Sequence, residues 1–66
     1  MIIAYEKNGS IYYNWGNRSN IFVVSNARLV SVSGNFIVYE QRGSIYKAEV
    51  DSNGNVCRTN IYVGRA

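Results

Sequence analysis

The feature that most constrains this 66-residue chain is an internal repeat. Seven of ten positions are identical between residues 3–12 (IAYEKNGSIY) and residues 37–46 (IVYEQRGSIY), at a spacing of 34 positions. Residues 20–23 match residues 60–63 at a spacing of 40, so the second copy holds six more residues, which we assign to its 51–55 turn. A unit this short cannot cover its own apolar face, so it must pack against its twin or against another surface.

The residues of both copies favour β-strands. Ile, Val, Tyr and Phe are abundant, proline is absent, and no apolar stripe keeps helical spacing for more than two turns. Pairs such as Asn8-Gly9 separate the apolar runs and favour hairpin turns, because both central residues of such a turn need positive φ. Strands are therefore expected at residues 2–7, 10–15, 20–25, 28–33, 35–41, 44–50 and 55–63.

These strands predict one all-β domain over residues 1–66, an antiparallel meander of six or seven short strands. Its repeat copies cover about 2–25 and 36–66, and residues 26–35 form a linking strand. A chain of this size buries only about 60% of the surface that its unfolded form exposes, so its core is marginal. We therefore expect a small barrel or a two-sheet sandwich that self-association completes.

Alternation in the second copy predicts which of its side chains are buried. Tyr46 and Val50 alternate with Lys47 and Glu49, and successive side chains of a strand point to opposite faces. The Tyr46 side is therefore expected to face the core, and the Lys47 side to face solvent.

The same phase, transferred to the first copy, places Tyr12 inside and Tyr13 and Trp15 outside. Asn17 and Arg18 follow directly, so Tyr13, Trp15, Asn17 and Arg18 form the predicted binding surface. Tyr, Trp and Arg dominate the hot spots of protein interfaces, which favours a protein partner for this surface.

The strand at 35–41 is apolar on both of its sides. Phe36 and Val38 lie on one side, and Ile37 and Tyr39 lie on the other. A strand of this kind is central in a closed structure or is covered by another chain. We therefore expect a homo-oligomer, most simply a dimer.

Residues that usually carry catalysis or bind metals are scarce. Histidine is absent, and the single cysteine, Cys57, is expected to be a half-buried strand residue. Glu6 and Glu40 occupy equivalent places in the two copies, and a carboxylate pair there is the one catalytic arrangement to weigh. We interpret both as exposed strand residues and expect no enzymatic activity, no cofactor and no metal.

The second copy runs from Ser33-Gly34 through Ile37-Val38-Tyr39 and Gly43-Ser44-Ile45-Tyr46 to the Asn53-Gly54 turn. In this order of turn glycines and strand formers it is similar to a blade of a β-propeller. The resemblance implies a blade-like strand order, and it implies that several copies would be needed to close a ring.

We weigh three binding functions, from the most to the least favoured. The first is protein binding, as an accessory or inhibitor protein of the kind found in phages and mobile elements. The alternative is nucleic-acid binding without sequence specificity, in which exposed aromatics stack on bases and arginines neutralise phosphates. The net charge is +3, and the basic residues for that alternative are Arg28, Arg42, Arg58 and Arg65. The third is carbohydrate binding by a ring-forming β oligomer.

The sequence contains no recognisable targeting signal. The apolar run at the N-terminus ends within five residues, and no later segment approaches the length of a membrane span. A single free thiol fits a reducing compartment. We therefore expect a cytoplasmic protein without a membrane partner.

Overall fold

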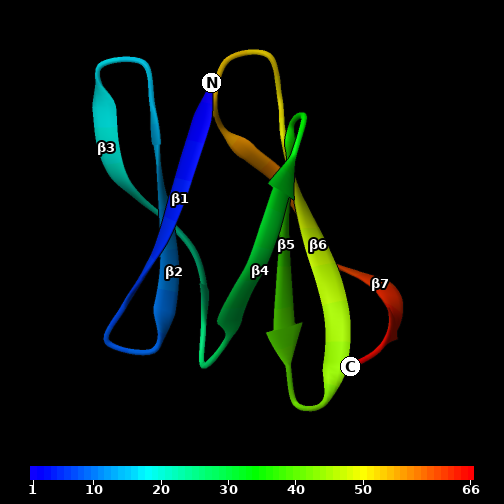
Figure 1. Ribbon diagram of the computed structural model, residues 1–66. Helices are drawn as coiled ribbons and strands as arrows, with labels where there is room; N and C mark the ends of the chain where they lie inside the picture. The colour runs from blue at the N-terminus through cyan, green and yellow to red at the C-terminus, as the bar shows by residue number, and fades with distance from the viewer.

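The computed structural model describes residues 1–66 and consists of strands and tight turns, with no helix that could cross a membrane (Figure 1). All neighbouring strands are antiparallel and form two sheets, sheet A in the order β1-β2-β3 and sheet B in the order β4-β5-β6-β7. The strands are β1 (Ile2–Lys7), β2 (Ser10–Trp15), β3 (Arg18–Ser25), β4 (Arg28–Ser33), β5 (Phe36–Gln41), β6 (Ser44–Val50) and β7 (Val56–Arg65). The prediction of an all-β meander is confirmed.

The hairpin turns of the two copies have the same backbone geometry. Asn8 and Gly9 have φ values of 54° and 80°, and Arg42 and Gly43 have values of 54° and 79°. Positive φ at both central residues is the signature of the type I′ turn, whose twist matches that of the flanking strands. In the second copy an arginine adopts the left-handed conformation that Asn8 adopts in the first.

The pairing of the strands repeats as the sequence does. Tyr5 faces Tyr12 in sheet A, and Tyr39 faces Tyr46 in sheet B; all six pairs of β1 with β2 recur between β5 and β6. The two irregularities between β2 and β3 also recur between β6 and β7. Sheet A and the last three strands of sheet B are therefore two copies of one three-stranded unit, and β4 is an additional strand.

Directly paired residues lie on the same side of a sheet, so each unit has two faces. We call one the isoleucine face; in sheet A it carries Ile2, Ala4, Ile11, Tyr13 and Ile21, and in sheet B Phe36, Val38, Ile45, Lys47 and Ile61. We call the other the aromatic face; in sheet A it carries Ile3, Tyr5, Tyr12 and Phe22, and in sheet B Ile37, Tyr39, Tyr46 and Tyr62.

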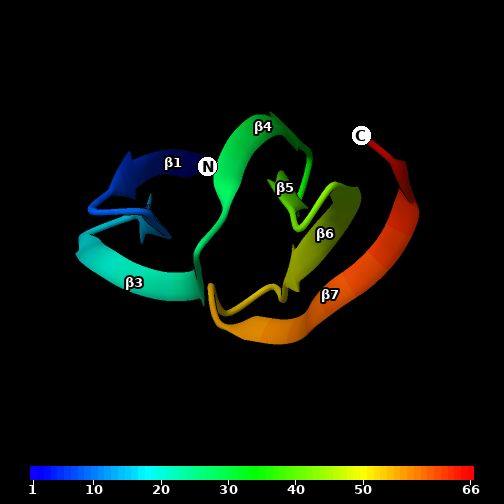
Figure 2. The ribbon, with the colours of Figure 1, turned by 90° about the horizontal axis from the view of Figure 1, so that it is seen from below.

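The core lies between the isoleucine face of sheet A and the aromatic face of sheet B. Figure 2 shows the two sheets side by side, with the chain passing once between them from β3 into β4. Ile11 and Tyr13 of sheet A and Ile37 and Tyr39 of sheet B are fully buried in one cluster. The two copies therefore bury opposite faces. They are stacked in the same sense, so that the isoleucine face of one packs on the aromatic face of the other, and like faces do not meet.

This stacking corrects the predicted orientation of the first copy. The alternation in the second copy is right, since Ala48 and Val50 are fully buried on the side that Tyr46 shares. Its transfer to the first copy is wrong, because Tyr13 is fully buried and Tyr12 lies half-buried on the outer side. Trp15 also faces inward and packs against the core.

Candidate functional site

Three of the four residues of the predicted binding surface converge on a turn of the second copy. The hydroxyl of Tyr13 donates a hydrogen bond of 2.6 Å to the carbonyl oxygen of Gly54, and Arg18 donates one of 2.7 Å to the same oxygen. The ring of Trp15 lies so close to Gly54 that a Cβ atom there would collide with it. Asn17, in the turn before Arg18, is exposed.

The turn that they hold, residues 51–55, is itself ordered by hydrogen bonds. The carboxylate of Asp51 accepts from the backbone N–H groups of Asn53 and Asn55, at 2.9 and 3.0 Å. Arg18 donates further bonds of 3.1 Å to the carbonyl oxygen of Asn53 and to the side chain of Asn55. The turn of the second copy, five residues long where the first copy has two, thus holds Tyr13, Trp15 and Arg18, which join the two sheets. The assignment of all six extra residues to this turn is therefore wrong, because the other three lengthen β6 and β7.

Two buried phenols have shifted ionisation. Burial raises the pKa of Tyr13 above its usual value, and the nearby charge of Arg18 opposes part of that rise. Burial likewise raises the pKa of Tyr39, against the hydrogen bond that its oxygen accepts from the backbone N–H of Asn60 at 2.8 Å. Both hydroxyls therefore stay protonated and act as neutral donors.

Apolar side chains are exposed on the aromatic face of sheet A. Ile3 and Phe22 are 57% and 53% exposed. The rings of Tyr5 and Tyr12 stack at 6.0 Å, and Phe22 meets Tyr12 edge-on at 5.7 Å. The Tyr5 hydroxyl donates to the side chain of Asn20.

Sequence reasoning missed this face as a contact surface. The signal was present, because aromatic residues occupy the matched positions 5 and 39, 12 and 46, and 22 and 62. In both copies these residues make the same arrangement, since Tyr39 and Tyr46 stack at 6.1 Å and Tyr62 meets Tyr46 edge-on at 5.9 Å.

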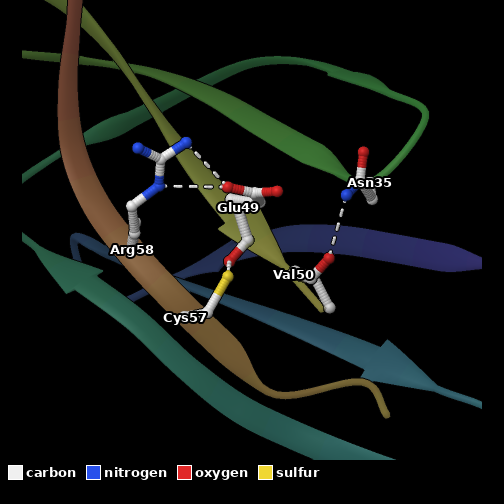
Figure 3. A network of polar contacts seen from close by, with 5 residues as sticks. All are labelled: Asn35, Glu49, Val50, Cys57 and Arg58. Carbon is white, nitrogen blue, oxygen red and sulfur yellow. Dashed lines mark hydrogen bonds and ion pairs between the residues drawn. The ribbon is translucent and has the colours of Figure 1, made fainter. Parts of the chain in front are cut away.

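The isoleucine face of sheet B, the other outer surface, carries paired charges among its apolar residues. Figure 3 shows Arg58 donating two hydrogen bonds, of 3.1 and 2.9 Å, to the carboxylate of Glu49. The ammonium of Lys47 lies 4.4 Å from the centre of the Phe36 ring. Cys57 donates a weak bond to the Glu49 carbonyl oxygen at 3.4 Å and is exposed, so the expected half-buried thiol is wrong.

The arginines of the nucleic-acid alternative divide between the two ends of sheet B. Arg28 pairs with Glu40 at 3.8 Å, beside the turn that holds Arg42, and Arg65 pairs along the backbone with Ser44 after that turn. Arg58 lies towards the opposite end and is bound to Glu49. The structure thus places Arg28, Arg42 and Arg65 at one end of sheet B, which we call the basic end. Arg42 and Arg65 make no ion pair.

The structure contains no pocket and no group of three or more residues suited to a metal ion. Glu6 and Glu40 lie in different sheets. No protein-family model, no curated protein and no solved structure matches the chain. The candidate site is therefore defined by the two outer faces and the basic end alone.

Proposed function

We propose that this protein is a non-enzymatic binding module that recognises a protein through the aromatic face of sheet A. Exposed apolar surface that is contiguous and rimmed by polar residues marks interaction sites. Ile3, Tyr5, Tyr12 and Phe22 supply such a surface, with Asn14 and Asn20 beside them. Tyrosine and phenylalanine are enriched in the cores of protein interfaces.

One observation carries the proposal. On the same face of the second copy, protein covers Ile37 and Tyr39, which are fully buried whereas their counterparts Ile3 and Tyr5 are not; Tyr62, the counterpart of Phe22, stays exposed. The spacing, rings and strand register of the two faces are equivalent, so a surface that packs on protein inside the molecule is also presented outside it. This likeness supports a protein rather than a nucleic acid as the partner.

The basic end favours nucleic acid as the second candidate. Arg28, Arg42 and Arg65 lie at one end of sheet B, where phosphates would be neutralised. The aromatic stacking platform expected with them is weakened, because Tyr13 is buried and Trp15 is packed on Gly54.

The substitution Phe22→Asp separates the two candidates. It places a charge on a side chain that is already exposed, so the fold is retained while the apolar contact is lost. We expect proteins that the wild type retains in elevated salt to be lost from immobilised Phe22→Asp, with Asn8→Asp, which adds the same charge at an exposed turn, as the matched control. Retention of the same proteins by Phe22→Asp would contradict the proposal.

The nucleic-acid candidate makes a different prediction. Its binding of a labelled single-stranded oligonucleotide, followed by fluorescence anisotropy, would fall steeply with salt and with the double variant Arg42→Gln, Arg65→Gln. Binding that survives Phe22→Asp but not the arginine variant would favour nucleic acid over protein.

A further inference from the structure

We propose that the partner of this aromatic face is a second copy of the chain, and that copies associate head to tail. The isoleucine face of sheet B in one molecule packs on the aromatic face of sheet A in the next. This inference rests on the proposed function, because it names the occupant of the same face.

The packing inside the molecule provides the template. Its core is an isoleucine face of one unit laid on an aromatic face of the other. Because the two units are stacked in the same sense, Ile37 on the aromatic face of sheet B is buried and its counterpart Ile3 is open, while Tyr62 and its counterpart Phe22 are exposed in both units. What remains outside is one aromatic face and one isoleucine face, which are the counterparts of the two faces that already pack together.

Matched residues show the difference in burial directly. Ile37 is 0% exposed on the covered aromatic face, against 57% for Ile3 on the open one. Val23, in the bulge of β3, is 6% exposed, against 55% for its counterpart Val63 in β7. Close packing depends on matching shapes, and the shared register and shared bulges give the open faces the same backbone pleat as the covered ones.

Glu49 and Arg58, two of the charges on the open isoleucine face, already form a pair. Burying an unpaired charge is costly, whereas a paired one with satisfied hydrogen bonds is tolerated. The Lys47 ammonium lies over the Phe36 ring and makes no ion pair, so the covering chain would have to supply its acceptor. Lys47 stands where the first unit has Tyr13, so a hydrogen-bond donor is kept at this position.

Such a contact is heterologous, since two different surfaces of the chain meet, and this makes it testable by complementation. Ile3→Asp spoils the aromatic face of sheet A, and Val63→Asp spoils the isoleucine face of sheet B, because their counterparts Ile37 and Val23 are buried in the joint inside the molecule. Each variant keeps one good face, and the two good faces are complementary. The matched control is Asn8→Asp, which adds the same charge on neither face.

The measurement is molar mass by size exclusion with light scattering over a range of protein concentrations. We expect the wild type and Asn8→Asp to exceed the 7.4 kDa of one chain, and each face variant alone to run as a single chain. An equimolar mixture of the two face variants should regain a one-to-one complex. Near-UV circular dichroism verifies that each variant is folded, and Tyr5→Asp with Ile61→Asp replaces any variant that is not.

Three outcomes would overturn the inference: a wild type of single-chain mass throughout, dissociation of Asn8→Asp as well, or assembly that survives Val63→Asp but not Ile3→Asp. The last result would mean that aromatic faces meet each other. A single-chain wild type that still retains other proteins through Phe22 would leave the proposed function standing. Retention that is indifferent to Phe22→Asp, together with assembly that is indifferent to Ile3→Asp, would remove both.

Discussion

At the scale of single residues, Gly54 occupies the most constrained position in the chain. Its φ of 85° is in the left-handed region, and the Trp15 ring covers the place where a side chain would begin. Its carbonyl oxygen accepts hydrogen bonds from both Tyr13 and Arg18. Backbone conformation, close packing and hydrogen bonding thus all depend on a glycine here.

We expect Gly54→Ala to lower the free energy of unfolding by about 2–5 kcal/mol, from left-handed strain of about 1–2 kcal/mol and overpacking of about 1–3 kcal/mol. Gly9→Ala is the matched control, since Gly9 has a φ of 80° and nothing within 4 Å of an added Cβ. It should cost only the strain, about 1–2 kcal/mol. Urea denaturation measures both free energies. Equal losses of stability in the two variants would contradict the overpacking, because they would show that the Trp15 ring moves aside without cost.

At the scale of the strand, the bulges of β3 and β7 repeat one device. Asn20 and Asn60 have φ values of 58° and 56°, and each accepts a hydrogen bond from a tyrosine of the first strand of its unit. Asparagine tolerates the left-handed conformation better than most residues do. Tyr39 donates to the Asn60 side chain at 2.5 Å and accepts from the Asn60 backbone at 2.8 Å.

Replacing Asn60 by glycine and by alanine separates the two roles of this residue. Asn60→Gly keeps the backbone conformation but removes the acceptor of the Tyr39 hydroxyl, at a cost of about 1–2 kcal/mol. Asn60→Ala adds left-handed strain of about 1–2 kcal/mol. Asn20→Gly should cost less than Asn60→Gly, because water reaches the half-buried Tyr5. Thermal and urea unfolding test this order, and a reversed order would contradict it.

The strands were predictable from the sequence, but the buried faces were not. Alternation and turn glycines placed all seven strands, with β3 and β7 each extending two residues beyond the prediction. The error at Tyr13 arose because the second copy was used to orient the first, which assumes that repeats bury the same side. Units stacked in the same sense bury opposite sides, and this arrangement leaves no trace in the alternation of either strand.

For the candidate site, too, the residue types were predictable from the sequence but their exposure was not. Ile3 and Phe22 could have been identified as apolar strand residues, yet only the stacking reveals that they face outward while Ile37 does not. Arg18 was expected on a binding surface, and its three acceptors lie in a turn 35 to 37 residues away in sequence. Contacts over such separations depend on how the sheets pack, which local patterns do not determine.

At the scale of the whole molecule, the two buried phenols couple stability to alkaline pH. The pKa values of Tyr13 and Tyr39 are raised in the folded state. Their contribution to stability is therefore complete below the unfolded value of about 10 and is lost as pH rises through the folded-state pKa. Folding is expected to weaken above about pH 10.

We expect Tyr13→Phe and Tyr39→Phe each to reduce this alkaline loss, because the phenol that must ionise is gone. Each also forfeits hydrogen bonds, so each starts from a stability lower by about 1 kcal/mol at neutral pH. Urea midpoints between pH 8 and 11 measure the slope, with the exposed Tyr62→Phe as the control. A slope unchanged in both buried variants would contradict the prediction.

The longer turn of the second unit has a consequence for how a duplicated chain selects one pairing of its two units. Two similar units could pack on each other in more than one way during folding, and a unit could also be exchanged between neighbouring molecules. Only the second unit carries the long turn at 51–55, and only the first carries Tyr13 and Trp15 to engage it. The contact of Tyr13 and Trp15 with this turn can form only between a first unit and a second unit, so the differences between the two copies determine which faces pack together inside the molecule.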